Sequence, residues 1–405
     1  MAPAQTSAPA GGAQKQDPSG FTIDSVSEIV FDDVVVSGGG KQLRLDLEGA
    51  LAGDTFDVAR VALSSGTTSM HGSGSVSSIS RRDGTFSMES PLVDVDEVLA
   101  VLAALAPADP SATGMSALAG EEPGGLTFGH VTARIKVDRG QALGYDVSKL
   151  DGAVEIKGTM LTARPLAFDL YGGRYESTLE LDLATNRIAL VHDAALTGTS
   201  VGKLVELFGN AGAATGGLGL TMRVRGAGKD FQSAARHVSG AATVRITDGT
   251  IAGLDVVRQA FTLLGTAPVE GTQGERFEWI AASLGVASGT LSTDDFVLHS
   301  PDFDLTGRLR IDPDGRISGD ADLMLSDALS AQAQSKNRDL KLAFEGGRVT
   351  LPVTIAGTLT NPRVLPDIND ALRRAARNRA GEEVDKAQKK ATDELKRGLN
   401  RLLKP

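Results

Sequence analysis

The residues of this 405-residue chain that could do chemistry lie far apart in the sequence. None of the five histidines stands at the HExxH spacing or at another spacing typical of a metal site. They are His71, His130, His192, His237 and His299. Cysteine is absent, which excludes thiolate ligands, a cysteine nucleophile and disulfide bonds. We therefore interpret the histidines as surface or turn residues and expect no metal site.

Three pairs of aspartates, each separated by one residue, could hold calcium or supply two-carboxylate chemistry. The pairs are Asp94 with Asp96, Asp302 with Asp304, and Asp312 with Asp314. No further ligand spacing completes a calcium loop around any pair. The first pair precedes a helical pattern, where carboxylates cap N-termini, and the third flanks a proline in a turn pattern. Structural roles therefore explain these carboxylates better than catalysis does.

Two glycine-rich segments that end in lysine, 38–41 and 226–229, lack the features of a phosphate-binding loop. Both miss the four-residue spacer and the Ser or Thr that such a loop requires. No Gly-x-Ser-x-Gly nucleophile motif occurs either. The sequence therefore predicts a protein that is not an enzyme and uses no cofactor.

One polar cluster is open to two interpretations. Arg174 lies between Tyr171 and Tyr175 in the segment Tyr-Gly-Gly-Arg-Tyr. These side chains could form a small polar contact at the mouth of a groove, or a turn with packed aromatic rings. Aromatic residues are only 4% of the chain, so large ring-lined pockets are not expected.

The charge of the chain argues against nucleic acid as a partner. The formal net charge is −10, whereas phosphate binding needs clustered Lys and Arg. From Asp367 to Pro405 we count eleven Lys or Arg against seven Asp or Glu, a balance of about +4. The remainder carries about −14, so an acidic body precedes a basic tail.

The elements that must position these residues are mostly β-strands. Leu43, Leu45 and Leu47 alternate with charged residues, which is the period-two pattern of a strand buried on one face. The same alternation occurs in segments 131–137, 179–183, 218–224 and 305–311. Its spacing predicts roughly twenty strands, mostly as an antiparallel meander. At about 4.8 Å per strand, one continuous sheet would be on the order of 100 Å long.

Turns and short helices punctuate these strands. Asp312–Gly315 and Asp248-Gly249 each stand between apolar residues and predict hairpin turns. Segment 239–264 combines an alternating strand with a short amphipathic helix pattern, and segments 90–105 and 196–208 repeat its second half. The 48 glycines fit a fold with many tight turns.

Composition divides the chain into five segments. They are a disordered leader (1–20), an N-terminal β segment with a short helix (21–105), a flexible linker (106–125), the main β body (126–365) and a basic helical tail (366–405). The leader lacks the apolar core of a signal peptide and the run of about 20 apolar residues of a membrane span. We therefore expect neither a signal peptide nor an anchor in this chain.

Four segments resemble the C-terminal region of the AsmA-like family, envelope proteins of Gram-negative bacteria related to bridge-like lipid transfer proteins. They are Glu89–Leu99, Phe168–Tyr175, Ser239–Asp255 and Leu351–Pro362. The elements Tyr-Gly-Gly-Arg-Tyr and Gly-Thr-Leu-Thr-Asn-Pro are moderately specific, and the four segments follow the order of the family's C-terminal region. The chain departs from the family at its N-terminal end, where the typical membrane helix is missing.

The resemblance implies a long, curved, open β-sheet whose concave face is apolar. It implies a periplasmic location with an inner-membrane anchor in a full-length form, and a role in phospholipid transport and outer-membrane homeostasis. The fold expected is thus mainly β, an antiparallel β-groove with short interspersed helices and a C-terminal helical tail.

The residues expected to line such a groove are apolar residues of the alternating strands. They are Leu43, Leu45, Leu47, Ile135, Val137, Leu179, Leu181, Leu183, Leu218, Leu220, Met222, Val224, Val244 and Ile246. Exposing an acyl chain to water costs about 0.8 kcal/mol per CH₂, and an apolar trough would remove most of that cost. Each of these side chains could instead pack in an ordinary core.

Two functions fit this sequence. The first is a non-enzymatic protein that binds phospholipid or another acyl lipid and supports lipid transport and outer-membrane assembly. The second is a structural or assembly-assisting periplasmic protein that affects outer-membrane protein insertion without carrying lipid. The basic tail could cover a sheet edge, dock a protein partner or lie on anionic lipid.

Overall fold

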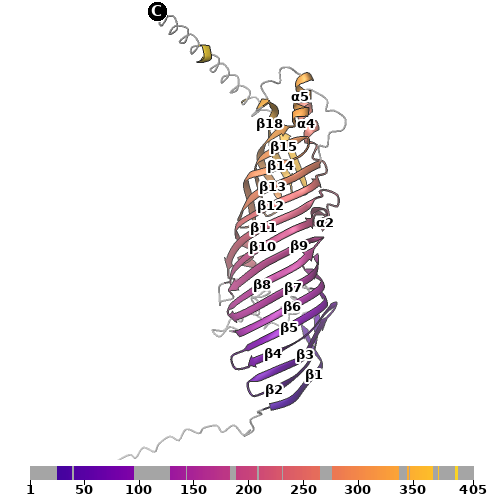
Figure 1. The fold of residues 1–405 in the computed structure, drawn as a ribbon, viewed down its shortest axis with the longest axis vertical. Coiled ribbons are helices and arrows are strands. Elements are labelled where there is room, and N and C mark those ends of the chain that lie inside the picture. Colours follow the sequence, from indigo (N-terminus) through magenta and orange to yellow (C-terminus); the bar gives the residue numbers. More distant parts are fainter. Residues whose placement is uncertain are drawn as a thin grey trace, which may run out of the picture.

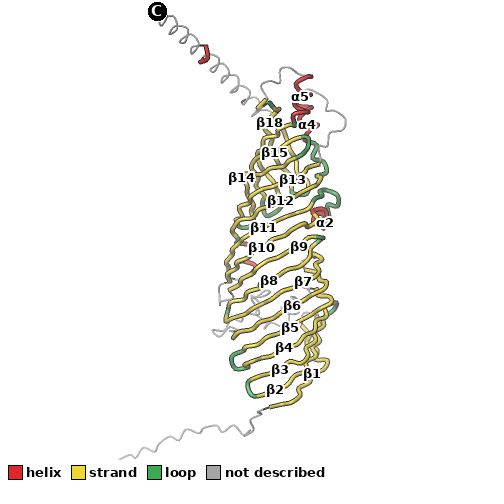
Figure 2. The backbone as a smooth tube through the Cα atoms, viewed as in Figure 1, coloured by secondary structure: helices red, strands yellow, loops and turns green. Residues whose placement is uncertain are grey.

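A computed structural model of the chain places most of its described residues in β-strands (Figure 2). The described residues are 25–38, 41–94, 128–142, 144–182, 188–207, 209–229, 231–264, 276–336, 344–345, 347–367, 373 and 388–390. The predicted leader 1–20, the predicted linker 106–125 and most of the predicted tail 366–405 lie outside these residues.

The described elements are strands of 2 to 15 residues and helices of 6 to 10 residues. The strands are β1 (Ser25–Gly38), β2 (Lys41–Ala52), β3 (Thr55–Ser65), β4 (Thr68–Ser78), β5 (Asp83–Asp94), β6 (Phe128–Ala142), β7 (Tyr145–Gly158), β8 (Met160–Leu170), β9 (Gly173–Asp182), β10 (Ile188–Ser200), β11 (Gly217–Gly228), β12 (Ser239–Thr250), β13 (Arg276–Ala287), β14 (Thr290–His299), β15 (Phe303–Ile311), β16 (Arg316–Leu325), β17 (Phe344–Glu345), β18 (Arg348–Thr358) and β19 (Asn361–Pro366). The helices are α2 (Val201–Leu207), α3 (Phe231–Arg236), α4 (Val256–Leu263) and α5 (Asp327–Lys336).

The strands lie side by side along one long axis, in the order in which they occur in the chain (Figure 1). Each strand from β1 to β15 pairs with the next, and β16 pairs with β18. Strand β18 also pairs with β17 and β19. Among the described strands no pairing joins β1 to β19, so the sheet is open. The prediction of a mainly β, long, curved and open sheet with short helices is confirmed.

One pair of neighbours departs from the predicted meander. Strands β5 and β6 are parallel, whereas every other described pair is antiparallel. Parallel neighbours need a longer connection than a hairpin turn, and residues 95–127 separate these two strands in the sequence. The strands on both sides of the predicted linker therefore belong to one sheet.

Bulges curve this sheet. Register shifts interrupt many of the ladders, for example between Ala163 and Leu166 on β8 and between Thr293 and Phe296 on β14. An extra residue on one strand bends that strand and increases its twist. Bulges repeated along the molecule therefore give a curved sheet instead of a flat one.

The two predicted hairpin turns have different outcomes. Asp312–Gly315 connects β15 to β16, and Gly315 has the positive φ of 79° that such a turn needs. The prediction for Asp248-Gly249 was wrong, because both residues lie inside β12. Asp248 has φ 53°, and the ladder passes from Thr247 directly to Gly249, which pairs with Phe277. The Asp-Gly pair thus forms an irregularity within the strand, where glycine leaves room for the phenylalanine ring.

The sheet has one apolar and one polar face. On β11, Leu218, Leu220 and Met222 point to one side and are partly buried, whereas Thr221 and Arg223 point to the other side and are exposed. Directly paired residues on neighbouring strands share a face. The register therefore extends the side that carries Leu220, here called the apolar face, along the sheet from β1 to β19.

Helices α4 and α5 close the apolar face at the C-terminal end of the sheet. Phe261 of α4 is fully buried, together with Phe277 and Phe303 of the sheet. We call this cluster, which lies in residues 254–364, the C-terminal core. In α5, Ser330 accepts a hydrogen bond from the backbone N–H of Val349 at 3.0 Å, which ties the helix to β18. Burial of each phenylalanine contributes about 1.5–3 kcal/mol, so this end of the molecule has an ordinary, closed interior.

Candidate functional site

All described residues among the predicted groove positions lie on the apolar face. Leu183 is outside the described residues. The others lie on β2 (Leu43, Leu45, Leu47), β6 (Ile135, Val137), β9 (Leu179, Leu181), β11 (Leu218, Leu220, Met222, Val224) and β12 (Val244, Ile246). Val137, Leu181 and Val224 are buried, and the remaining ten are partly buried. Ile246 packs against the C-terminal core.

Strand β10 joins the candidate residues of β9 to those of β11. It places Leu190, Ala194 and Leu196 on the apolar face, and these were missed in the sequence. The reason is that β10 also carries Ala189 and Val191 on the polar face, so its sequence does not alternate. A continuous apolar run hides the face that a period-two pattern would reveal.

Helix α3 covers one edge of this region. Gly226 and Gly228 lie on the apolar face of β11 so close to Ala234 of α3 that a side chain at either position would overlap the helix backbone. Ala234 is fully buried, and Leu181, which lies in the same row of the sheet as Gly226, is 3% exposed. Helix α3 therefore covers β11 and the neighbouring strand β10, beside which Leu181 lies on β9.

Large side chains of β5 lie flat on the apolar face instead of projecting from it. A Cβ built on Gly74 would be 2.5 Å from Cδ1 of Phe86, and one on Gly72 would be 2.5 Å from Sδ of Met88. The two glycines pair with these residues across the β4–β5 ladder. Glycine in a strand permits such close approach. At these two positions the side chains of β5 therefore lie against the backbone of β4.

The sequence of the middle of this sheet matches a known family. Residues 104–296, which include β6 to β13, match the sequence model of the AsmA family. The chain is AsmA-like. The resemblance to the AsmA-like family is thereby confirmed, and two of the four segments that suggested it, Phe168–Tyr175 and Ser239–Asp255, lie within the match. No curated protein matches the chain, and no solved structure does.

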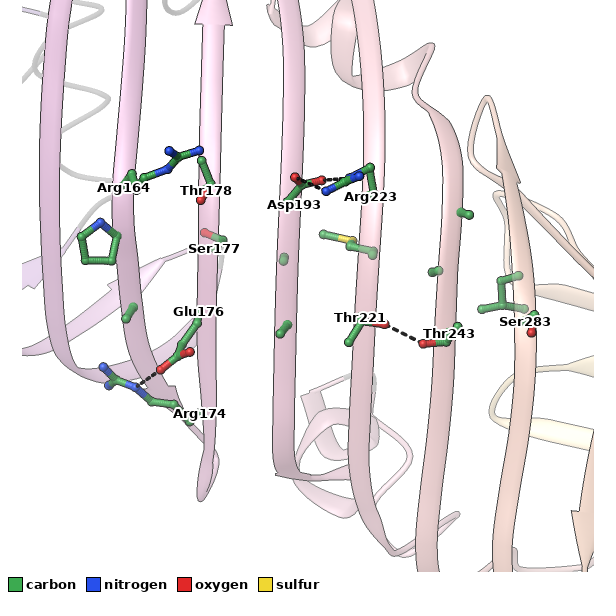
Figure 3. A pocket seen from close by; sticks show the side chains of 18 of the residues that line it. Arg164, Arg174, Glu176, Ser177, Thr178, Asp193, Thr221, Arg223, Thr243 and Ser283 are labelled. Carbon is green, nitrogen blue, oxygen red and sulfur yellow. Dashed lines mark hydrogen bonds and ion pairs between the residues drawn. The ribbon is translucent and has the colours of Figure 1, made fainter.

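The AsmA-like sheet also has a depression of about 1070 Å³ over strands β7 to β13. Most of the side chains labelled in Figure 3, among them Glu176, Asp193, Thr221 and Arg223, belong to the polar face by register. The lining also includes Ser177, Ala194 and Met222, which the register places on the apolar face, so the depression shares Met222 with the predicted groove positions.

The charged groups that line the depression lie near partners of opposite charge. Nε of Arg223 donates to Oδ1 of Asp193 at 2.6 Å, and Nη2 donates to Oδ2 at 3.0 Å (Figure 3). This hydrogen-bonded pairing lowers the pKa of Asp193. Arg174 donates to Asp169 at 2.9 Å. Asp193, Arg223 and Arg174 are thus held in ion pairs, and the lowered pKa of Asp193 keeps it a carboxylate.

Tyr175 and His192 interrupt the apolar face of β9 and β10. The hydroxyl oxygen of Tyr175 is 2.8 Å from Nε2 of His192, and the ring of Phe168 stacks on Tyr175 with centroids 4.4 Å apart. The interpretation of His192 as a surface or turn histidine was wrong, since it is partly buried in mid-strand. Of the two interpretations of the Tyr-Gly-Gly-Arg-Tyr segment, the turn with packed aromatic rings holds, whereas Arg174 pairs with Asp169 and not with either tyrosine. Tyr171 lies in the β8–β9 turn, while Tyr175 makes the polar contact.

Burial changes the pKa of both partners. Desolvation lowers the pKa of His192 and raises the pKa of Tyr175, so both side chains are held in their neutral forms. Within the described residues, no group of three or more His, Asp or Glu could hold a metal ion. None of the described helices is both long enough and apolar enough to cross a bilayer.

Proposed function

We propose that this AsmA-like chain binds the acyl chains of phospholipid on its apolar face and so supports lipid transport and outer-membrane assembly. One observation carries the proposal. The apolar face continues from strand to strand through β2 to β12, and of the described helices only α3 packs on it at β10 and β11. Contiguous apolar surface of this kind marks interaction sites in soluble proteins.

The energetics favour an acyl chain as the ligand. Moving a sixteen-carbon chain through water costs on the order of 12 kcal/mol. An apolar surface that runs across consecutive strands, each about 4.8 Å from the next, offers contact over the whole length of such a chain. Membership of the AsmA family is compatible with this role.

The direct test compares two adjacent residues of β11 on opposite faces. A photoreactive amino acid is placed at Leu220 of the apolar face or at Thr221 of the polar face, and lipids of the purified protein are identified by native mass spectrometry. The proposal expects co-purified phospholipid and lipid crosslinks from position 220 but not from position 221. Lipid-free protein with no crosslink from position 220 would contradict it.

We further propose a periplasmic location, with inner-membrane anchoring in a full-length form, and a protein partner bound through the basic tail 366–405. A lipid route between two membranes needs a protein that lies between them, which motivates this placement. Fractionation of cells that produce the full-length protein tests it. Recovery in the cytosol would contradict the proposal.

The alternative function is a structural or assembly-assisting role without lipid. The C-terminal core favours it, because there the apolar face is filled by the side chains of α4 and α5. Under this alternative, the apolar face of β2 to β11 is covered by protein in the cell. Crosslinks from position 220 to protein and never to lipid would support the alternative.

A further inference from the structure

One place on the apolar face differs in chemistry from the rest. In the described strands from β8 to β11, His192 is the only His, Asp, Glu, Lys or Arg that the register places on this face. It pairs with Leu179 on one side and with Val224 on the other. A polar group on an apolar surface costs free energy unless it has a hydrogen-bond partner.

The local sequence builds a platform for this histidine. Tyr175 pairs with Leu196, four positions along β10 from His192. The pair between them is Ser177 with Ala194, two small residues. The phenol and the imidazole can therefore lie along the sheet and meet above this small pair, with ring centroids 6.4 Å apart. Phe168 stacks on the tyrosine ring and fixes its position.

Of the two ring nitrogens of His192, only Nε2 has a hydrogen-bond partner among the described residues. A phenol is the better donor and a neutral imidazole nitrogen the better acceptor, so the hydroxyl of Tyr175 donates to Nε2 of His192. The proton of the neutral ring is then on Nδ1. No residue that the structure describes accepts a hydrogen bond from Nδ1. An N–H group is thus held by Tyr175 on an otherwise apolar surface.

We propose that Nδ1 of His192 binds an oxygen acceptor of an ester lipid, either an ester carbonyl or a phosphate oxygen, whose acyl chains lie on the apolar face. This inference rests on the proposed function and specifies where on the apolar face the polar part of the lipid binds. The polar part of the lipid is held at β9 and β10, with apolar side chains on the strands to either side. Burial supports the assignment, because the lowered pKa of His192 keeps the ring uncharged among acyl chains.

The test uses the purified full chain and three photoreactive probes of equal chain length. The probes are a diacyl phosphatidylglycerol, its dialkyl ether analogue and a hydrocarbon. The variants are His192→Leu, Tyr175→Phe and His192→Asn, the last of which keeps an N–H donor near the position of Nδ1. Circular dichroism and melting temperature show which variants are folded. Apparent dissociation constants are then measured by crosslinking.

We expect His192→Leu to weaken binding of the diacyl lipid about two- to tenfold, the usual net effect of one hydrogen bond, and to leave hydrocarbon binding unchanged. Tyr175→Phe should weaken it less, and His192→Asn should restore it. Loss with the diacyl lipid alone identifies the ester carbonyl, whereas equal loss with the ether analogue identifies the phosphate.

Two results would overturn the assignment of His192 without contradicting the proposed function. One is wild-type affinity of folded His192→Leu for both phospholipids. The other is a loss that the hydrocarbon shares and that His192→Asn does not restore, since this reports damage to the sheet. If the wild-type chain binds none of the three probes, the proposed function itself fails.

Discussion

The two ends of the described sheet use the same alternating pattern for different purposes. In β13 to β19, apolar residues such as Leu323 and Leu351 lie under α4 and α5 and are at most 3% exposed. In β2 to β11, residues such as Leu45 and Leu220 have the same place in the register but remain partly buried. The difference is made by the helices that pack on the sheet, and not by the strands.

This comparison shows why a strand pattern alone cannot distinguish a core from a ligand-binding surface. An apolar stripe predicts that something will cover it. At the C-terminal end, the cover is part of the described chain. Along β2 to β9, no described helix supplies it, and this is the part of the sheet to which the proposed function assigns lipid.

The largest expected effect is a cavity in the closed end. Phe261→Ala should lower the free energy of unfolding of the C-terminal core by about 3–5 kcal/mol, because the ring is fully buried among other apolar side chains. Leu220→Ala should cost clearly less, because Leu220 is only partly buried. Hydrogen exchange measures the two regions separately. Equal losses of protection would show that the two ends do not differ.

The second largest expected effect comes from displacing α3, which covers the apolar face at β10 and β11. Gly226→Val should displace α3, because the new side chain overlaps the carbonyl of Ala234, and overpacking of this kind costs about 1–3 kcal/mol. A photoreactive group at Leu190, which pairs with Gly226 and is buried, should then crosslink lipid, which it should not do in the wild-type background. Gly285→Ala is the matched control, since its Cβ would be 3.4 Å from Ser292 Oγ, a contact to a small side chain that can adjust. Unchanged protection of α3 in Gly226→Val would refute this account of the edge.

A smaller effect separates the two faces. Leu220→Arg should reduce the amount of co-purified lipid several-fold, because it places a charge on the apolar face. Thr221→Arg introduces the same charge on the exposed polar face and should leave lipid content unchanged. Lipid extraction followed by mass spectrometry measures both. A similar loss in the two variants would mean that the face does not decide binding.

The smallest expected effect is on stability at low pH, and it concerns Asp295 at a bulge between β13 and β14. A register shift between Ala281 and Gly285 takes the N–H of Ser283 out of the β13–β14 ladder, and Asp295 accepts it at 2.8 Å. Hydrogen bonds from Ser283 and Thr293 lower the pKa of Asp295 to about 2. Its pKa in the folded state is thus below the unfolded value of about 3.9.

Its contribution to stability is therefore full above pH 4 and is lost as the pH falls toward 2. Asp295→Asn should remove this part of the pH dependence and lower stability slightly at pH 7. Melting temperatures between pH 2 and 7 provide the measurement. Parallel curves for the variant and the wild type would argue against the assigned role.

Much of the sheet could be predicted from sequence because period-two patterns depend only on local alternation. Leu43 to Leu47 and Leu218 to Val224 show this, since both stripes lie on one face as alternation requires. The apolar-face residues of β10 were not predicted, because Ala189 and Val191 make both faces of this strand apolar. Asp248-Gly249 was misread because a turn and an irregular strand use the same left-handed backbone conformation.

The sites depend on contacts that no local pattern encodes. The packing of α3 requires a glycine at position 226 of β11, and the role of His192 requires a tyrosine on a neighbouring strand. The sequence did show the Tyr-Gly-Gly-Arg-Tyr segment as a cluster with two interpretations. It could not show the partner of Tyr175, because the register between β9 and β10 brings that residue into reach.

The most direct test of the central claim is a crosslinking scan along the apolar face in living cells. Photoreactive groups are placed at Leu45, Ile135 and Leu220 in the open part and at Leu323 and Leu351 in the closed part. The account predicts phospholipid adducts at the first three positions and none at the last two. Lipid adducts absent from all three open positions, or equally abundant in the C-terminal core, would contradict it.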